Sequence, residues 1–227
     1  PAGNLQFCDY NLIQITTCPK CGFSANDLSF FKKQNTDEPP FNVEKLNEVW
    51  GEKSKSLYEE AQKSKESYFT EDRSVNDALL SYDLAILSMN QLAEIEKDPK
   101  KKINYIRKVA SLLLFQAEVL MENQQRAKAE SNLEEVVKAL EPVFQNMEGA
   151  VIIHTALLIF QIKIYFGDTQ SAAQYMKFMD GYDPDGKLDP NGEEAKELKV
   201  SSNKLKAVFD DREILNKDSL SRFHLDE

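Results

Sequence analysis

Apolar residues recur at helical spacing along most of the chain, and the clearest run lies between residues 103 and 120. Its members are three or four positions apart: Ile103, Ile106, Ala110, Leu113, Ala117 and Leu120. An α-helix completes a turn in 3.6 residues, so this spacing places every member on one face. The run therefore predicts an amphipathic helix whose apolar stripe packs against a neighbour.

Similar runs on both sides predict further helices. Ser74 is a suitable N-cap for a helix that ends before Pro99, and Pro142 should kink or end the helix that follows residue 126. Residues 150–166 are apolar nearly all round, which predicts the most buried helix. Gly167 then supplies a left-handed stop before the next helix. Because the connecting turns are short, successive helices must run antiparallel to one another.

The two ends of the chain differ from this helical middle. The alternating stretch Leu12–Thr17 and the breaker Pro39-Pro40 predict a small β/loop segment, and Asn42 is a plausible N-cap for one charged helix that continues to about residue 67. The predicted segments are 1–41 (β/loop with a C-x-x-C knuckle), 42–72 (long charged helix), 73–179 (tetratricopeptide-like helical hairpins), 180–192 (Asp-rich turns) and 193–227 (C-terminal helix and tail). The fold class predicted is mainly α, with antiparallel helical hairpins stacked in tetratricopeptide-like fashion.

Charge and hydropathy narrow the class of partner. The formal net charge of −10 argues against nucleic-acid binding, because neutralising phosphates requires a dense Lys/Arg surface. The most apolar stretch, 150–166, is interrupted by polar residues and is therefore expected to be a core helix rather than a membrane span. The chain begins at Pro1 rather than at methionine, so we expect an upstream piece in the natural protein.

The cysteines form the sharpest local motif. Cys18-Pro19-Lys20-Cys21-Gly22 is a C-x-x-C turn that presents two thiols at the separation accepted by tetrahedral Zn²⁺. Cys8 is the candidate third ligand, and a complete site needs a fourth. The sequence leaves a zinc half-site and a disulfide or relic about equally open. A thioredoxin-like redox role is less favoured, because no βαβ alternation surrounds the motif.

The Asp-rich turns offer oxygen ligands that suit a hard cation such as Ca²⁺. The candidate ligands are Asp183, Asp185 and Asp189. Their spacing does not match an EF-hand, and the intervening prolines sit where type I turns favour them. Plain turns are therefore the favoured interpretation.

The remaining residues give no indication of catalysis. His154 lies in an apolar helix and His224 in the tail, and neither has the partners of a catalytic constellation. The common nucleotide-binding, metalloprotease and serine-hydrolase motifs are absent from the sequence. The aromatic residues of the middle region are expected to pack between helices or to anchor a partner: Trp50, Tyr58, Tyr68, Phe69 and Tyr82. We therefore expect a non-enzymatic protein without an obligatory cofactor.

Two stretches carry a resemblance to a known family. Residues 10–25, which lead from an apolar strand into the C-P-x-C-G knuckle, and residues 78–85 (Ala-Leu-Leu-Ser-Tyr-Asp-Leu-Ala) resemble an uncharacterised bacterial family with a tetratricopeptide-like helical domain. That family usually carries a second C-P-x-C pair upstream; residues 1–17 contain none, so the site is incomplete unless the sequence before Pro1 supplies it. The resemblance implies the mainly helical fold and covers nearly the whole chain.

The Lys/Asn/Glu-rich, all-helical character also resembles the spirochaete flagellar coiling proteins, which coat the periplasmic flagellar filament. That resemblance implies a structural protein of the filament sheath, with sheath or core proteins, or further copies of itself, as partners. The first alternative is a cytoplasmic zinc-binding adaptor that uses Cys8, Cys18 and Cys21. The second is a redox enzyme that uses Cys18 and Cys21.

Overall fold

The computed structural model describes residues 10–31, 41–69, 73–182, 189 and 192–210. Helices make up most of this part of the chain, and a two-stranded antiparallel sheet lies near its beginning. The predicted mainly-α class is therefore confirmed. The chain divides into two compact units, residues 1–132 and 133–227, which are described separately. Within the described residues, no helix is long and apolar enough to cross a membrane.

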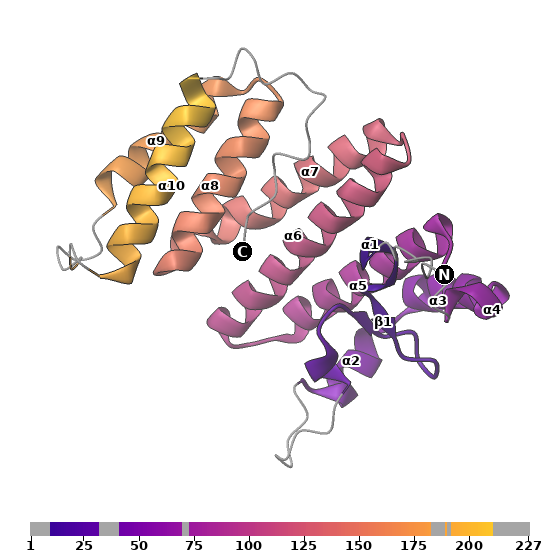
Figure 1. Ribbon diagram of the computed structural model, residues 1–227. Coiled ribbons are helices and arrows are strands. Elements are labelled where there is room, and N and C mark those ends of the chain that lie inside the picture. The colour runs from indigo at the N-terminus through magenta and orange to yellow at the C-terminus, as the bar shows by residue number, and fades with distance from the viewer. Residues whose placement is uncertain (1–9, 32–40, 70–72, 183–188, 190–191, 211–227) are drawn as a thin grey trace, which may run out of the picture. The chain divides into compact units, whose positions relative to one another are not determined.

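Unit 1 is built on a helical hairpin. Its two members are α5 (Val75–Ile95) and α6 (Pro99–Glu122), which lie side by side in Figure 1. The Ser74 side chain accepts a hydrogen bond from the Asp77 N–H, so the predicted N-cap is confirmed. Asp98 caps α6 in the same way, and Pro99 occupies the first turn, where its missing N–H costs nothing.

The predicted stripe of α6 is buried in part. Its second half is buried, whereas Ile103 and Ile106 are only half-buried. Leu112 and Val119 are fully buried although neither belongs to the stripe. The apolar face of α6 is therefore wider than the strict three-and-four spacing predicted, because α6 has neighbours on more than one side.

The N-terminal segment forms a small sheet against α5. Its elements are α1 (Tyr10–Ile13), β1 (Thr16–Thr17), β2 (Ser24–Ala25) and the 3-10 helix η1 (Leu28–Phe30). Thr16 pairs with Ala25 and Thr17 with Ser24 in antiparallel register. Ser24 N–H also donates to Ser88 Oγ of α5 at 3.0 Å. The predicted β/loop character of this segment is therefore confirmed in its described part.

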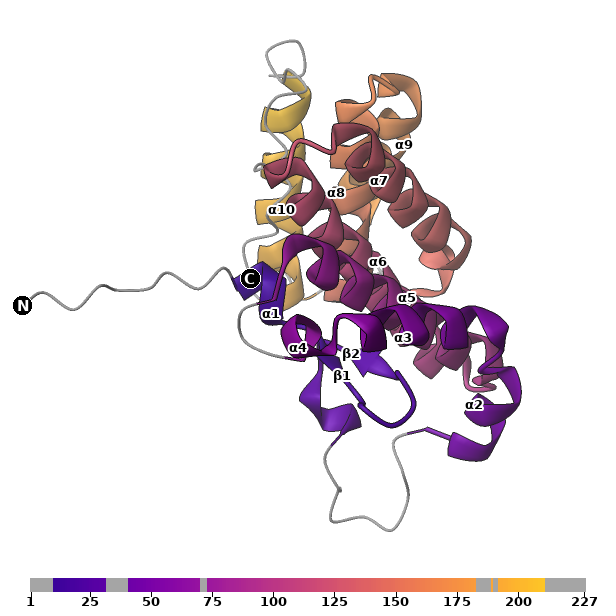
Figure 2. The same ribbon diagram turned by 90° about the vertical axis from the view of Figure 1, so that its right-hand side faces the viewer.

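The single long helix predicted from residue 42 to about residue 67 is wrong. Three helices occupy this stretch: α2 (Val43–Val49), α3 (Glu52–Lys63) and α4 (Lys65–Tyr68). The predicted N-cap Asn42 is correct, and its side chain accepts from Lys45 N–H at 2.9 Å. The first break falls at Trp50-Gly51, where Trp50 has ψ 69° and Gly51 disfavours helix continuation. In Figure 2 α4 lies near β1, and Tyr68 OH of α4 is 2.9 Å from Thr17 Oγ1 of β1.

The boundary between the units falls within α7 (Arg126–Leu140). As predicted, the α-helix ends before Pro142, and the chain continues as the 3-10 helix η2 (Glu141–Asn146). Pro142 lies in the first turn of η2, where its lack of an N–H removes no helical hydrogen bond. The proline therefore sets the end of α7.

Unit 2 packs two further helices against one apolar helix. Its main elements are α8 (Ala150–Tyr165), α9 (Thr169–Gly181) and α10 (Glu193–Asp210), which Figure 1 shows side by side. α8 is the most buried of them, as predicted. Gly167 adopts φ +77° after α8, and the Asp168 side chain accepts from Ser171 N–H to cap α9.

Candidate functional site

The C-x-x-C motif forms a tight knuckle between β1 and β2. Cys18 N–H donates to Phe23 O at 2.8 Å, and Gly22 N–H donates back to Cys18 O at 2.9 Å. The loop closes because Gly22 adopts φ +77°, a left-handed conformation that a residue with a Cβ atom adopts only with strain. The short strands therefore hold the two thiols at the end of a hairpin.

Backbone N–H groups of the knuckle point at the sulfur atoms. Burial opposes ionisation of Cys18, yet hydrogen bonds from the N–H groups of Lys20 and Cys21 hold the pKa of the Cys18 thiol below its ordinary value. Burial raises the pKa of the Cys21 thiol, and its interaction with the Cys18 sulfur raises it further. The two sulfurs are thus close enough to interact directly. A pair held in this way is able to chelate a soft metal ion or to form a disulfide.

Two aromatic side chains, from the end of α2 and from α3, hydrogen-bond to the knuckle. Trp50 Nε1 donates to Cys21 O at 3.0 Å, and Tyr58 OH donates to Pro19 O. The Tyr58 ring lies against Gly22 so closely that a Cβ atom at Gly22 would be 2.7 Å from the ring. The break between α2 and α3 is therefore part of the site, because it turns the Trp50 indole toward the knuckle.

An aromatic cluster continues from the knuckle to the end of the α5–α6 hairpin. Its members are Phe23, Phe30, Phe31, Phe41, Trp50 and Tyr105. The rings of Phe23 and Phe41 are stacked with centroids 5.0 Å apart, and Phe30 lies 6.4 Å from Tyr105. These separations are those at which aromatic pairs attract one another. The cluster joins the N-terminal segment to α6.

An ion pair fixes η1 against α6 beside this cluster. Lys108 Nζ lies 2.9 Å from Asp27 Oδ2 and 5.3 Å from the centroid of the Phe30 ring. Hydrogen bonds from Ser29 and from Lys108 lower the pKa of Asp27 to about 2. Asp27 therefore remains ionised throughout the neutral range and is available to pair with Lys108 there.

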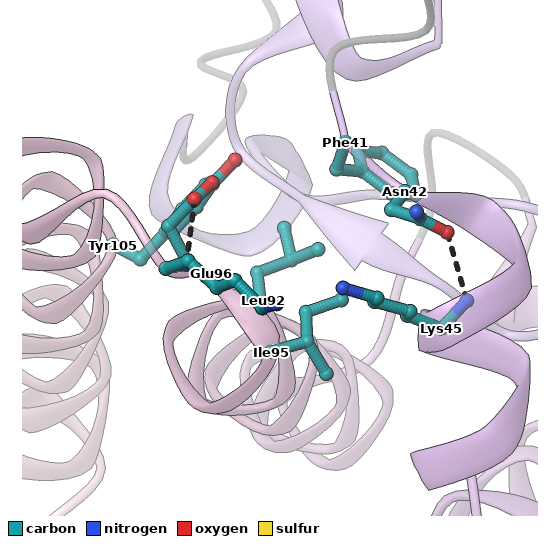
Figure 3. Close-up of a pocket in the computed structure, with 8 residues that line it drawn as sticks. Phe41, Asn42, Lys45, Leu92, Ile95, Glu96 and Tyr105 are labelled. Atoms are coloured by element: carbon teal, nitrogen blue, oxygen red, sulfur yellow. Dashed lines mark hydrogen bonds between the residues drawn. The ribbon is translucent and has the colours of Figure 1, made fainter.

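A pocket of about 150 Å³ opens beside the cluster in unit 1. It is lined by Phe41, Asn42, Lys45, Leu92, Ile95, Glu96, Lys97 and Tyr105. In Figure 3, Leu92 and Ile95 of α5 lie between Phe41 and Lys45 on one side and Glu96 and Tyr105 on the other. We call it the Phe41–Tyr105 pocket. It combines an apolar floor with two aromatic walls.

The charged groups at this pocket favour an anionic ligand group. Glu96 follows the last residue of α5. Its Oε1 accepts hydrogen bonds from the N–H groups of Lys97 and Asp98, at 2.8 and 2.9 Å. The ammonium groups of Lys45 and Lys97 have no ion pair within the part of the chain that the structure describes. Two lysines and one glutamate thus line the pocket, which leaves it one net positive charge.

A family model covers most of the chain. It matches residues 6–199 and describes an uncharacterised protein conserved in bacteria (DUF2225). The chain belongs to this family. Searches of curated proteins and of solved structures found no significant match.

Membership of DUF2225 confirms the predicted resemblance to an uncharacterised bacterial family. The match includes the knuckle, the Phe41–Tyr105 pocket and all of α8. It carries no assignment of function, so the resemblance to flagellar coiling proteins stays a prediction.

The predicted metal ligands are only partly within the described residues. Cys18 is half-buried and Cys21 is exposed, and both thiols are free. Cys8, the predicted third ligand, lies outside the described residues. No cluster of three or more His, Cys, Asp or Glu side chains suited to a metal occurs among the residues that are described. The zinc site stays a prediction with two of its ligands in place.

The predicted calcium ligands lie mostly outside the described residues as well. Asp183 and Asp185 belong to the undescribed stretch, whereas Asp189 is exposed and its carbonyl accepts from Gly192 N–H at 2.9 Å. That hydrogen bond closes a turn directly before α10, in keeping with the favoured turn interpretation. Calcium binding stays a prediction.

The packing role predicted for the aromatic residues is confirmed for some of them, and partner anchoring stays a prediction. Tyr68 and Tyr82 are fully buried between elements of unit 1, whereas Trp50 and Tyr58 hold the knuckle. The pocket itself was not predicted. Its walls come from positions 41 and 105, which are 64 residues apart, so only the paired fold brings them together. The local signal was the dense run of phenylalanines between residues 23 and 41.

Proposed function

We propose that this protein is a non-catalytic binding protein that docks partner proteins at the Phe41–Tyr105 pocket on the end of the α5–α6 hairpin. The observation that carries the proposal is the pocket itself, with its aromatic walls and with two lysines against one glutamate in its lining. The ligand that suits it is a peptide segment bearing one large apolar side chain next to a carboxylate.

The size of the pocket supports a single side-chain anchor. A cavity of about 150 Å³ is large enough to hold a benzene ring, and here Phe41, Leu92 and Ile95 supply its apolar lining. Leu92 and Tyr105 are themselves buried, so packing fixes the positions of these two lining side chains. Anchors of this kind account for most of the energy of protein interfaces.

The charges support an acidic neighbour to that anchor. Lys45 is half-buried on the wall opposite Tyr105, and Figure 3 shows its side chain directed across the pocket toward Ile95. A carboxylate that follows the anchor residue would meet Lys45 or Lys97 at the rim. An acidic peptide is otherwise repelled by a chain of net charge −10, so these lysines would determine where such a peptide docks.

The proposal is tested with a library of random 12-residue peptides displayed on phage and selected on the full chain. We expect the enriched sequences to share a Phe, Leu or Trp beside an Asp or Glu. Fluorescence anisotropy of a selected peptide then measures its Kd for the wild type and for Lys45→Glu. Reversing this charge should weaken binding at least tenfold, which corresponds to about 1.4 kcal/mol.

Lys204→Glu is the matched control, because it makes the same change in net charge at an exposed position of α10 in unit 2. It should leave the Kd within about twofold. Equal losses in the two variants would mean that only overall charge matters, and no enrichment over an unrelated protein would refute the docking site.

The periplasmic flagellar filament sheath is the narrower form of this proposal, in which the partners are sheath or core proteins. Its support is the overall resemblance to flagellar coiling proteins and not a contact of any described residue. Immunogold labelling of isolated flagella tests it: label along the filament supports the sheath, and filaments without label contradict it.

The alternative function, a zinc-binding tetratricopeptide-like adaptor, is favoured by one observation. Backbone N–H groups point at the knuckle sulfurs, as expected where thiolates hold a metal. Zinc binding and partner binding would use different parts of unit 1. The stacked Phe23–Phe41 pair joins the knuckle to the pocket.

A further inference from the structure

Two thiols of unit 1 have no part in the docking that we propose. Cys18 and Cys21 are both free, and a hydrogen bond links their sulfur atoms across the knuckle. Gly22 N–H donates to Cys18 O at 2.9 Å and closes the turn that holds the pair. A disulfide between the two thiols therefore needs no approach of another element.

The knuckle is fixed by the helices and open to solvent at its sulfurs. Trp50 and Tyr58 donate to carbonyl groups of the loop, and the Tyr58 ring covers Gly22. Cys21 is nevertheless exposed, and Cys18 is half-buried. A small dissolved molecule can therefore reach the sulfurs, whereas the backbone that carries them stays in place.

The two sulfurs have unequal surroundings. The Cys18 sulfur accepts hydrogen bonds from the N–H groups of Lys20 and Cys21, and the Lys20 ammonium group also favours a negative charge on it. The Cys21 sulfur accepts from one backbone N–H, that of Phe23. Such contacts favour the thiolate, which is the form that attacks a disulfide. Cys18 is therefore the better nucleophile, and the exposed Cys21 is placed to act as the resolving thiol.

We propose that Cys18 and Cys21 form a reversible thiol–disulfide site that reacts with low-molecular-weight disulfides. The Cys18 thiolate attacks one sulfur of the small disulfide, whose S–S bond breaks and releases one thiol. Cys21 then attacks the Cys18 sulfur of the mixed disulfide and releases the second thiol. The pair is oxidised by two electrons, the small disulfide is reduced to two thiols, and the two cysteine protons end on those thiols.

The same contacts make the bond easy to reduce again. A disulfide is labile when its reduced form is stabilised, and the N–H groups of the knuckle stabilise the reduced sulfurs. A structural disulfide resists reduction by glutathione, whereas this one is expected to yield to it. The site accordingly responds to the thiol–disulfide balance of its surroundings, a function that does not depend on the docking pocket.

The test exposes the reduced full-length chain to oxidised glutathione and then to an excess of reduced glutathione. After alkylation of the remaining thiols, peptide mass spectrometry should find Cys18 joined to Cys21, and both should be free again after the second step. The fluorescence of Trp50, whose indole donates to Cys21 O, should change and recover in parallel. No disulfide, a disulfide that survives reduced glutathione, or bound zinc that keeps both thiols from reacting would each overturn the proposal.

Single variants in a Cys8→Ser background assign the roles of the two residues. Cys21→Ser lacks the resolving thiol and should accumulate the mixed disulfide of Cys18 with glutathione. Cys18→Ser should form the corresponding adduct at Cys21 several-fold more slowly. The Cys8→Ser protein itself should form and lose the Cys18–Cys21 bond as the wild type does. Equal rates in the two single variants would contradict the order of attack, and a requirement for Cys8 would overturn the site.

Discussion

The central helices of the two units, α5 and α8, are buried by different means. α5 buries Asp77, Ser81 and Ser88 among its apolar residues, whereas Thr155 is the one polar side chain in the buried set of α8. The buried set of α8 is instead mostly aliphatic and includes Ile153, Ile159 and Ile162, each of which is fully buried. Buried hydrogen bonds therefore help to position α5, whereas apolar packing alone positions most of α8.

The difference follows from what each helix must hold. α5 supports strands, turns and short helices whose backbone and side-chain polar groups need partners: Ser88 accepts from Ser24 N–H, and Asp77 accepts from the hydroxyls of Ser64 and Ser67. α8 packs on helices, which satisfy their own backbone groups. Buried polar positions on a central helix therefore mark the unit that carries an irregular and, by our proposal, functional segment.

The largest loss of stability should come from a cavity in unit 2. Phe160→Ala removes a fully buried ring from α8 and should lower the free energy of unfolding by about 3–5 kcal/mol. Val200→Ala, at an exposed position of α10, should change it by less than about 0.5 kcal/mol. Urea unfolding followed by circular dichroism measures both. Similar losses in the two variants would mean that α8 is not the packed centre of unit 2.

A pair of glycines with the same backbone conformation sharpens the contrast. Gly22 and Gly167 both have φ +77°, but a Cβ atom at Gly22 meets Tyr58 at 2.7 Å whereas one at Gly167 meets nothing within 4 Å. Gly167→Ala should cost about 1–2 kcal/mol from the left-handed conformation alone. Gly22→Ala adds overpacking of about 1–3 kcal/mol. The fluorescence of Trp50, the single tryptophan, reports the knuckle directly, and equal losses would contradict its tight closure.

Acid should destabilise unit 1 by protonating Asp77. Burial opposes ionisation, yet hydrogen bonds from Ser74, Ser64 and Ser67 hold the pKa of this carboxyl below its ordinary value. Its stabilisation is therefore present above the unfolded pKa of about 3.9 and is lost as pH falls through the folded pKa.

Asp77→Asn should cost about 1.5–3 kcal/mol at neutral pH, because hydrogen bonds to a charged group are lost. The gap between the wild type and this variant should narrow on acidification from pH 7 to pH 3, as measured by urea unfolding at each pH. Asp180→Asn, at an exposed position of α9, is the control. A gap that widens toward acid would contradict the assigned direction of the pKa shift.

The smallest effect compares one hydroxyl in each central helix. Ser88→Ala leaves the buried Ser24 N–H without its acceptor, which should cost about 1–2 kcal/mol. Thr155→Val removes a hydroxyl that donates only to Val151 O of its own helix and should cost less than about 0.5 kcal/mol. Thermal unfolding measures both. A larger loss for Thr155→Val would reverse the distinction between the helices.

The helices that pack on other helices could be predicted from the sequence because their signals are local. Ser74 and Asn42 cap where the pattern placed them, and Pro142 ends α7. The break at Trp50-Gly51 could not be predicted in the same way. The apolar stripe continues across the break. The Trp50 indole hydrogen-bonds to the carbonyl of Cys21, which lies 29 residues earlier in the chain.

The candidate site was predictable only at the knuckle, where five consecutive residues carry the motif. The Phe41–Tyr105 pocket depends on how α2, α5 and α6 meet, and helical periodicity carries no information on that geometry. Lys45 illustrates the limit. On the sequence it is one of many solvated charges of a helix, and its proximity to Leu92 and Ile95 makes it a candidate ligand-binding group.

The most direct test of partner docking in unit 1 is a methyl NMR titration of the full chain with a selected acidic–apolar peptide. We predict saturable shifts of the Leu92 and Ile95 methyl groups in α5, with no shift of Ile153 and Ile159 in α8. Shifts centred on α8, or none at saturating peptide, would contradict the central claim that partners dock at the Phe41–Tyr105 pocket.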